Sequence, residues 1–259
     1  MSETRPPIAL SIAGSDPTGG AGLQLDLRVF ERHGVHGMAV PTALTIQTTK
    51  GVHQVLPVFP NVAGEQLHLL LGDIVPDAIK IGMLASDDVL LRVAMGLERC
   101  QAPRIVDPVL AASDGSLLLE RRALGNLCER ILPGAELVTP NLAEAEALTG
   151  TRDPEAAARA LLELGAQAAL VKGGHAEGPA DDFLLTAAGG TWLRAARLDA
   201  GPVHGTGCAL SSAIAARTAR GEGIEAAVRG AKDFVARAIA RAAGIGAGQR
   251  VLRFDDDTA

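Results

Sequence analysis

Aromatic side chains are unusually scarce in this 259-residue chain: they make up 2% of it, and tyrosine is absent. Proteins that bind single-stranded nucleic acid commonly stack bases on aromatic side chains inside a basic groove. The chain instead has a net charge of −6 and no block of lysine or arginine. We therefore expect no nucleic-acid partner. An anionic ligand would have to be bound by backbone amides, single cations or a metal ion.

Cysteine is also rare, since only Cys100, Cys128 and Cys208 are present and no two of them form a C-x-x-C pair. This argues against a disulfide framework or a structural zinc site and fits a reducing compartment. No apolar run approaches the length of a bilayer span, and the N-terminal apolar run is too short for a signal peptide. We predict a cytoplasmic protein with no membrane contact.

Two common nucleotide-binding motifs are missing. The sequence contains neither GxxxxGK[ST], which binds phosphates in P-loop proteins, nor GxGxxG, which binds dinucleotides. The missing GxGxxG argues against a nicotinamide oxidoreductase. Any nucleotide must be held by a different arrangement.

What the sequence does contain is an alternation of short apolar runs with longer helical patterns. Strands are predicted over residues 8–14, 37–47, 77–83, 103–109, 135–141 and 168–174, followed by a hairpin over 182–196 that turns at Gly189–Gly190. Helices are predicted over 21–34, 142–149, 154–164, 207–220 and 223–243. One more helix is predicted to begin after Ser86, which would cap it. This alternation predicts an α/β fold with a mainly parallel sheet covered on both faces. Because no repeat or linker interrupts it, we predict one domain over 1–259.

Polar and glycine residues gather at the carboxyl ends of the predicted strands, in the segments GSDPTGGAG, TIQTT, KIGML, DPV, TPNLAEAE and KGGH. Ligands of open α/β sheets bind beyond these ends, so we expect a site there. Ordinary structural roles are alternatives at this point. The glycines suit a plain turn, Asp26 suits a pair with Arg28 or Arg32, and Gln47 suits a turn.

Two acidic residues at neighbouring strand ends suggest a cation site. Asp107 ends an apolar strand, where an ionised carboxylate is costly unless it is paired or bound to a metal. Glu144 lies at the start of a predicted helix, where the helix dipole alone would favour it. The two could jointly hold Mg²⁺ through water. Lys172 precedes two glycines and could reach an anion, although a solvated lysine is the alternative.

The segment GPVHGTGCALSSAIA, residues 201–215, joins a glycine-rich loop to a predicted helix. The N–H groups of residues 205–208 would lie at the helix N-terminus, where a phosphoryl group or oxyanion can bind. The same position favours a thiolate and would lower the pKa of Cys208, which could then act as a base or nucleophile. A small buried residue at a crowded turn is the alternative, and spacing does not decide between them.

Seven segments in order resemble the hydroxymethylpyrimidine/phosphomethylpyrimidine kinases of thiamine biosynthesis, a family of the ribokinase-like superfamily. They are GSDPTGGAGLQLDL, ALTIQTTKGV, KIGML, VDPV, TPNLAEAEAL, VKGGH and HGTGCALSSAIA. The resemblance runs from about residue 8 to residue 242. It implies a three-layer α/β/α fold and phosphorylation of 4-amino-5-hydroxymethyl-2-methylpyrimidine by ATP and Mg²⁺, first to the monophosphate and then to the diphosphate. It also implies a homodimer, because paired subunits are common in the superfamily.

The resemblance also implies how the pyrimidine would be bound. Asp26 and Gln47 would contact its amino group and ring nitrogen. Gly14, Met83 and Val109 would form the wall of the pocket.

The remaining candidates would act on phosphate. Asp107 and Glu144 resemble the carboxylates that hold Mg²⁺, and Asn141 and Lys172 resemble contacts to the phosphates of the nucleotide. The GTGC segment resembles the anion hole of the superfamily, with Cys208 as the base. Its members are Gly205, Thr206, Gly207 and Cys208.

The chain departs from the usual family pattern at Ile46 and Thr48 and in segment 111–117, which lacks the usual lysine. These departures bear on the shape of the pocket and on substrate preference. Two alternative functions remain open at this point: a pyridoxal-type vitamin kinase on the same fold, and a sensor that binds a pyrimidine without catalysis.

Overall fold

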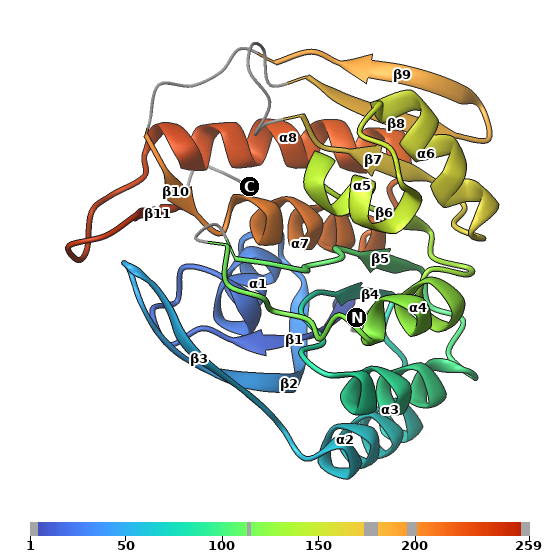
Figure 1. The fold of residues 1–259 in the computed structure, drawn as a ribbon, viewed down its shortest axis with the longest axis vertical. Helices are drawn as coiled ribbons and strands as arrows, with labels where there is room; N and C mark the ends of the chain where they lie inside the picture. Colours follow the sequence, from blue (N-terminus) through green and yellow to red (C-terminus); the bar gives the residue numbers. More distant parts are fainter. Residues whose placement is uncertain (1–4, 113–114, 174–180, 196–200, 255–259) are drawn as a thin grey trace.

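The computed structural model describes residues 5–112, 115–173, 181–195 and 201–254. Its centre is a nine-stranded sheet with the order β3-β2-β1-β4-β5-β6-β7-β8-β9 (Figure 1). The six strands from β2 to β7 in this order run parallel to one another. They are β1 (Ile8–Ser15), β2 (His36–Thr48), β4 (Ala78–Ile81), β5 (Arg104–Val106), β6 (Leu137–Val138) and β7 (Ala169–Val171). The predicted, mainly parallel sheet is confirmed.

Antiparallel strands extend the sheet at both edges. β3 (Gly51–Pro57) pairs with β2, and β8 (Asp182–Thr186) and β9 (Gly189–Leu193) form a hairpin beside β7. The predicted turn at Gly189–Gly190 is wrong, because both glycines already pair with β8 and the turn lies at residues 187–188. A separate two-stranded sheet joins β10 (Val203–His204) to β11 (Arg250–Val251).

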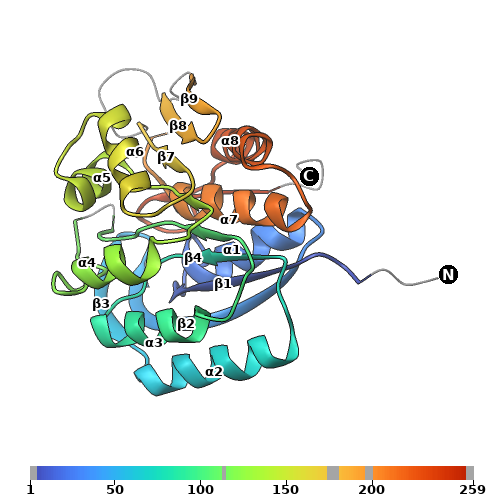
Figure 2. The same cartoon turned by 90° about the vertical axis from the view of Figure 1, so that its right-hand side faces the viewer.

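Helices cover both faces of the sheet, as Figures 1 and 2 show. One face carries α2 (Pro60–Asp73), α3 (Asp87–Leu97), α4 (Ala123–Asn126) with the π-helical turn Leu127–Ile131, α5 (Leu142–Thr149) and α6 (Pro154–Glu163). The other carries α1 (Gly22–Arg32), α7 (Thr206–Ala219) and α8 (Ile224–Ala240). Successive side chains of a strand point to opposite faces, so β1 places Leu10 in one core and Ala9 in the other. The three-layer α/β/α arrangement is confirmed.

Local sequence signals explain several helix starts. The Ser86 hydroxyl accepts a hydrogen bond from the Val89 N–H at 3.3 Å, and Asp153 accepts one from the Ala156 N–H at 2.8 Å. Both residues are good N-caps because they satisfy N–H groups that have no partner within the helix. None of the helices in the described ranges is long and apolar enough to cross a membrane.

Candidate active site

The carboxyl ends of β5 and β7 meet at a buried ion pair. The Lys172 ammonium donates to Asp107 Oδ1 at 2.9 Å, and hydroxyl groups donate from Thr139 at 3.1 Å and Ser211 at 3.3 Å. Asp107 is only 2% exposed. Burial alone would raise its pKa, but Lys172, Lys80 and the donated hydrogen bonds outweigh burial and hold the pKa below its ordinary value. Asp107 is therefore ionised at neutral pH.

A second buried carboxylate, Glu144, lies at the start of α5. Asn141 caps this helix by accepting from the Glu144 N–H, and Glu144 accepts from the Asn141 N–H at 2.8 Å, which completes a capping box. Burial raises the pKa of Glu144 to about 7, and the charge of Asp107 adds to this while Lys172 opposes it. Because the side-chain oxygen of Asn141 serves as the cap, a contact to phosphate would come from its Nδ2 amide.

The two carboxylates fit a hard divalent cation. Their oxygens are the ligand type that Mg²⁺ prefers, and a cation between them would relieve both the cost of burial and their mutual repulsion. Within the described ranges, no group of three or more His, Cys, Asp and Glu side chains could hold a metal by itself. A magnesium ion here would have to complete its coordination with water and substrate phosphates, as Mg²⁺ commonly does.

We expect Glu144 to make the stability of the free protein depend on pH. Its proton is bound more tightly in the folded chain, where the pKa is about 7, than at the ordinary value of 4.5. This contribution is therefore fully present below the lower value and is lost as pH rises through about 7, by at most roughly 3 kcal/mol. Glu144→Gln keeps an acceptor for the Asn141 N–H and removes the titration. Urea unfolding from about pH 5 to about pH 8 should therefore show a flatter profile for the variant.

The control for this experiment is Glu146→Gln, on the same helix but with an exposed side chain that pairs with Arg152. It should follow the wild-type profile. Identical pH dependence in wild type and Glu144→Gln would show that Glu144 does not titrate in this range.

The first turn of α7 faces the Lys172–Asp107 pair. Gly205 precedes the helix with a φ of +81°, and Thr206 is its first residue. A Cβ placed on Gly207 would lie 3.3 Å from the Lys172 ammonium nitrogen and 3.7 Å from Asp107 Oδ2. Because the first N–H groups of a helix have no partner within it, those of Thr206, Gly207 and Cys208 remain for an anion that binds beside this pair. The structure thus brings the predicted anion hole, lysine and carboxylates together.

Cys208 lies in the same turn and is partly buried. Burial raises the pKa of its thiol to about 11; Lys80 opposes this, and the charges of Asp26 and Asp107 add to it. The prediction of a lowered thiol pKa is therefore wrong for the free protein. The loss of water around the sulfur is the largest influence on its pKa.

Three of the predicted pocket residues form one apolar wall. A Cβ on Gly14, in β1, would lie 2.9 Å from the sulfur of Met83, so a side chain there would displace Met83. Met83 belongs to a small buried cluster against which Val109 packs. Gly14, Met83 and Val109 therefore lie together, and their role as the wall of a substrate pocket stays a prediction.

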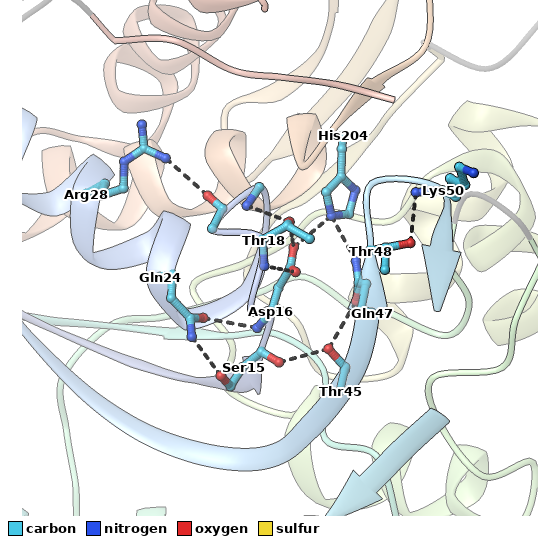
Figure 3. A network of polar contacts seen from close by, with 12 residues as sticks. Ser15, Asp16, Thr18, Gln24, Arg28, Thr45, Gln47, Thr48, Lys50 and His204 are labelled. Carbon is cyan, nitrogen blue, oxygen red and sulfur yellow. Dashed lines mark hydrogen bonds and ion pairs between the residues drawn. The ribbon is translucent and has the colours of Figure 1, made fainter. Parts of the chain in front are cut away.

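Gln47, at the end of β2, belongs to a polar network that reaches the α7 loop (Figure 3). Its amide lies 3.1 Å from Nε2 of His204, and the same ring nitrogen lies 2.8 Å from Asp16 Oδ2. Burial would raise the pKa of Asp16, but hydrogen bonds from His204 and Thr18 hold it below its ordinary value. Since His204 directly precedes Gly205, the network links Gln47 to the loop at the start of α7.

Asp26 makes its side-chain hydrogen bonds with other buried residues of the protein. Its side chain is 0% exposed, and its carboxylate accepts from Ser11 and Ser212 at 2.6 Å each and from Lys80 at 2.8 Å. A fully buried carboxylate with three donors does not support a direct contact with a ligand. We therefore assign it no pyrimidine contact.

Comparison with known proteins identifies the family. The family described as phosphomethylpyrimidine kinase matches residues 16–253. The chain belongs to this family. It is therefore a kinase, as the resemblance of its motifs implied.

Individual relatives of this kinase agree. The hydroxymethylpyrimidine/phosphomethylpyrimidine kinase of Streptomyces coelicolor is 42% identical over 248 residues, which cover 94% of this chain and 92% of the relative. The solved phosphomethylpyrimidine kinase of Clostridium difficile is 36% identical, with a TM-score of 0.80 and coverage of 90% and 99%. Pyridoxal kinase from Staphylococcus aureus, solved with AMP-PCP and pyridoxal, is 31% identical, with a TM-score of 0.88 and coverage of 96% and 94%. ATP and a small-molecule substrate are thus the ligands of this kinase.

Sequence reasoning missed three polar residues of the kinase: Asp16, Lys80 and His204. Asp16 lies in the motif GSD and His204 lies in the motif HGTGC. In these motifs the candidates were the glycines, Thr206 and Cys208. Lys80 offered a clearer signal, because a lysine inside the apolar strand DAIKIGM must be paired when it is buried. In the motif VKGGH, Gly174 and His175 lie outside the described residues.

Proposed function

We propose that this kinase phosphorylates 4-amino-5-hydroxymethyl-2-methylpyrimidine and then its monophosphate, with ATP as the phosphoryl donor. The observation that carries the proposal is the meeting of the Lys172–Asp107 pair with the first turn of α7, next to the apolar wall of Gly14, Met83 and Val109. The names of the relatives support this substrate class.

In this proposal, phosphoryl transfer depends on position and on neutralised charge, since little covalent chemistry falls to the protein. The N–H groups of Thr206, Gly207 and Cys208 bind the transferring phosphoryl group at the helix N-terminus. Lys172 and the Asn141 amide contact the phosphates of the nucleotide. Asp107 and Glu144 would hold Mg²⁺, which supplies further neutralisation of phosphate charge when it is bound.

Recognition of the pyrimidine falls to Gln47 and the apolar wall. A primary amide donates and accepts hydrogen bonds side by side, which matches an amino group next to a ring nitrogen. The Thr45 hydroxyl lies 3.1 Å from the Gln47 side-chain oxygen and the His204 ring lies beside the amide nitrogen, so these two residues hold the Gln47 amide in a fixed direction. Cys208 is the proposed base for the hydroxyl of the first substrate.

The test is product analysis after incubation with the hydroxymethylpyrimidine, ATP and Mg²⁺. We expect the monophosphate first and the diphosphate later, with one ADP formed for each monophosphate and two for each diphosphate. A parallel incubation with pyridoxal addresses the alternative suggested by the pyridoxal kinase structure. Faster turnover of pyridoxal would overturn the proposed substrate, and no ADP with either compound would favour a non-catalytic sensor.

A homodimer in the cytoplasm completes the proposal. β2 and β3 carry an exposed apolar stripe in which Leu44 and Leu56 are directly paired and Ile46 follows on β2. These side chains are 55%, 42% and 52% exposed, in that order, which suits contact with a second copy. Sedimentation velocity measures whether the chain is a dimer.

A further inference from the structure

Asp26, which makes no ligand contact in our assignment, belongs to a fully buried group of four polar side chains. The Lys80 ammonium donates to Asp26 Oδ2 at 2.8 Å, and the hydroxyls of Ser11 and Ser212 donate to the two carboxylate oxygens. All four residues are 0% exposed. They come from β1, α1, β4 and α7, so this buried group, here the Lys80 cluster, joins four elements.

Burial of two charges is costly unless their geometry is good, and apolar residues of similar size often stabilise a fold equally well. A buried ion pair is therefore weak evidence for a purely stabilising role. The cluster also constrains its surroundings. A Cβ on Gly82 would lie 2.6 Å from the Lys80 nitrogen and 3.2 Å from the Ala13 side chain, so the ammonium needs a glycine beside it.

The cluster reaches the catalytic turn through α7. Ser212, which donates to Asp26, comes four residues after Cys208, so the two side chains lie one turn apart on the same face of the helix. α7 packs against β1, β4 and α1, the elements that carry the rest of the cluster. Asp26 thus joins the Lys80 ammonium to α7 at Ser212, one helical turn after Cys208.

The charges around the sulfur come from four elements: Lys80 from β4, Asp26 from α1, Asp107 after β5 and Lys172 after β7. The Gly22 N–H from α1 also acts on it. Of these, Lys80 favours the thiolate most strongly, while Asp26 opposes it and thereby moderates the effect. Burial by itself would favour neutral Lys80, but Asp26, Cys208 and Asp107 raise its pKa, so Lys80 stays charged.

We propose that Lys80 is a positioning residue that Asp26 and Ser212 join to α7, where its permanent charge stabilises the Cys208 thiolate for removal of the substrate's hydroxyl proton. The proton moves from the hydroxyl oxygen to the sulfur, and the alkoxide oxygen then attacks the terminal phosphorus of ATP while ADP leaves. This inference rests on the proposed function. The proposed effect of Lys80 applies only to the first phosphorylation, because the attacking oxygen of the monophosphate is already ionised.

The first measurement is the rate at which iodoacetamide alkylates Cys208 in a Cys100→Ser/Cys128→Ser background, where Cys208 is the only cysteine. Lys80→Met should slow alkylation about tenfold, because a shift of one unit in thiol pKa changes the thiolate fraction about tenfold. Lys232→Met removes a lysine that pairs with Asp182 outside the Lys80 cluster, so it is the matched control and should stay within about twofold.

The second measurement compares the two phosphorylations. Lys80→Met should slow the alcohol step about tenfold and change the monophosphate step by less than about threefold. Equal losses in both steps, or an unchanged alkylation rate in Lys80→Met, would overturn the inference and leave only a structural role. If Lys80→Met does not fold, Asp26→Leu/Lys80→Met removes both charges of the buried pair and should still slow alkylation, because Lys80 acts on the sulfur more strongly than Asp26. An unchanged rate in that double variant contradicts the proposal.

The two proposals fail separately in these experiments. Alkylation needs no turnover, so it tests the effect of Lys80 even if the substrate is a different alcohol. Wild-type chain that forms neither product would overturn the proposed function while leaving the alkylation result intact.

Discussion

Cys208→Ala is expected to slow phosphorylation of the hydroxymethylpyrimidine by about 10²–10⁴-fold, the usual contribution of a general base. Phosphorylation of the monophosphate should fall by less than about tenfold. The two steps differ physically because a phosphomonoester has a second pKa of about 6, so its attacking oxygen is largely ionised at neutral pH without help. Initial rates for each acceptor, measured separately with saturating ATP and Mg²⁺, give the comparison.

The raised pKa of the thiol adds a pH dependence. With a value of about 11, only a small fraction of Cys208 is thiolate at neutral pH. Below that value the fraction grows about tenfold for each pH unit, so the alcohol step should accelerate between about pH 7 and about pH 9. The monophosphate step should not show this rise, because its nucleophile is already ionised.

Cys128→Ala is the control for the cysteine experiment. Cys128 is also partly buried and its thiol pKa is also raised by burial, but it lies in the π-helical turn after α4 and packs against the opposite core. It should leave both rates close to those of wild type. Equal losses of the two phosphorylations in Cys208→Ala would remove Cys208 from the role of base.

Gly205→Ala is expected to reduce both phosphorylations by about 10²-fold or more, comparable to the loss of an oxyanion-hole donor. Gly205 has a φ of +81°, which costs a residue with a side chain about 1–2 kcal/mol. The added Cβ would also clash with the carbonyl oxygen of Gly20 and lie 2.8 Å from Leu25. The loop must therefore move, and the N–H groups of the first α7 turn move with it.

Gly201→Ala separates the cost of a positive φ from the clash of the added Cβ. Gly201 also has a positive φ, of +63°, but a Cβ there would have open space around it. The Gly201→Ala variant should lose a similar amount of free energy of unfolding and keep most of its kinase activity. Steady-state rates for both acceptors and a thermal unfolding curve for each variant are sufficient. Activity in Gly205→Ala equal to that in Gly201→Ala would contradict the role assigned to the first turn of α7.

Much of the fold followed from the periodicity of the sequence. The buried parallel strands are short apolar runs in the sequence, and α3 and α6 begin directly after their predicted N-caps, Ser86 and Asp153. The elements that were not predicted have weak patterns. Most residues of β3 are exposed, and α2 buries only Ala63 and Leu67. With so little burial, neither segment carries a clear apolar repeat.

Part of the candidate site could also be predicted from the sequence, and part could not. Asp107, Glu144 and Lys172 were predicted to meet because parallel strands bring their carboxyl ends to one edge, and the structure brings them together. The pairing partners were not predictable. Arg28 and Arg32, the alternative partners that the sequence offered for Asp26, lie on its own helix, whereas its cation, Lys80, comes from a strand 54 residues away in the chain.

The sequence alone determined the α/β class, the edge of the sheet that carries the site, and the family, because period, capping residues and ordered motifs are local properties of the chain. Tertiary structure decided which charges are paired and how each is hydrated. It turned Asp26 from a ligand contact into the partner of Lys80, and it raised the pKa of Cys208 instead of lowering it. Both outcomes depend on burial and on charges from distant segments, which only folding brings within a few ångströms of each other.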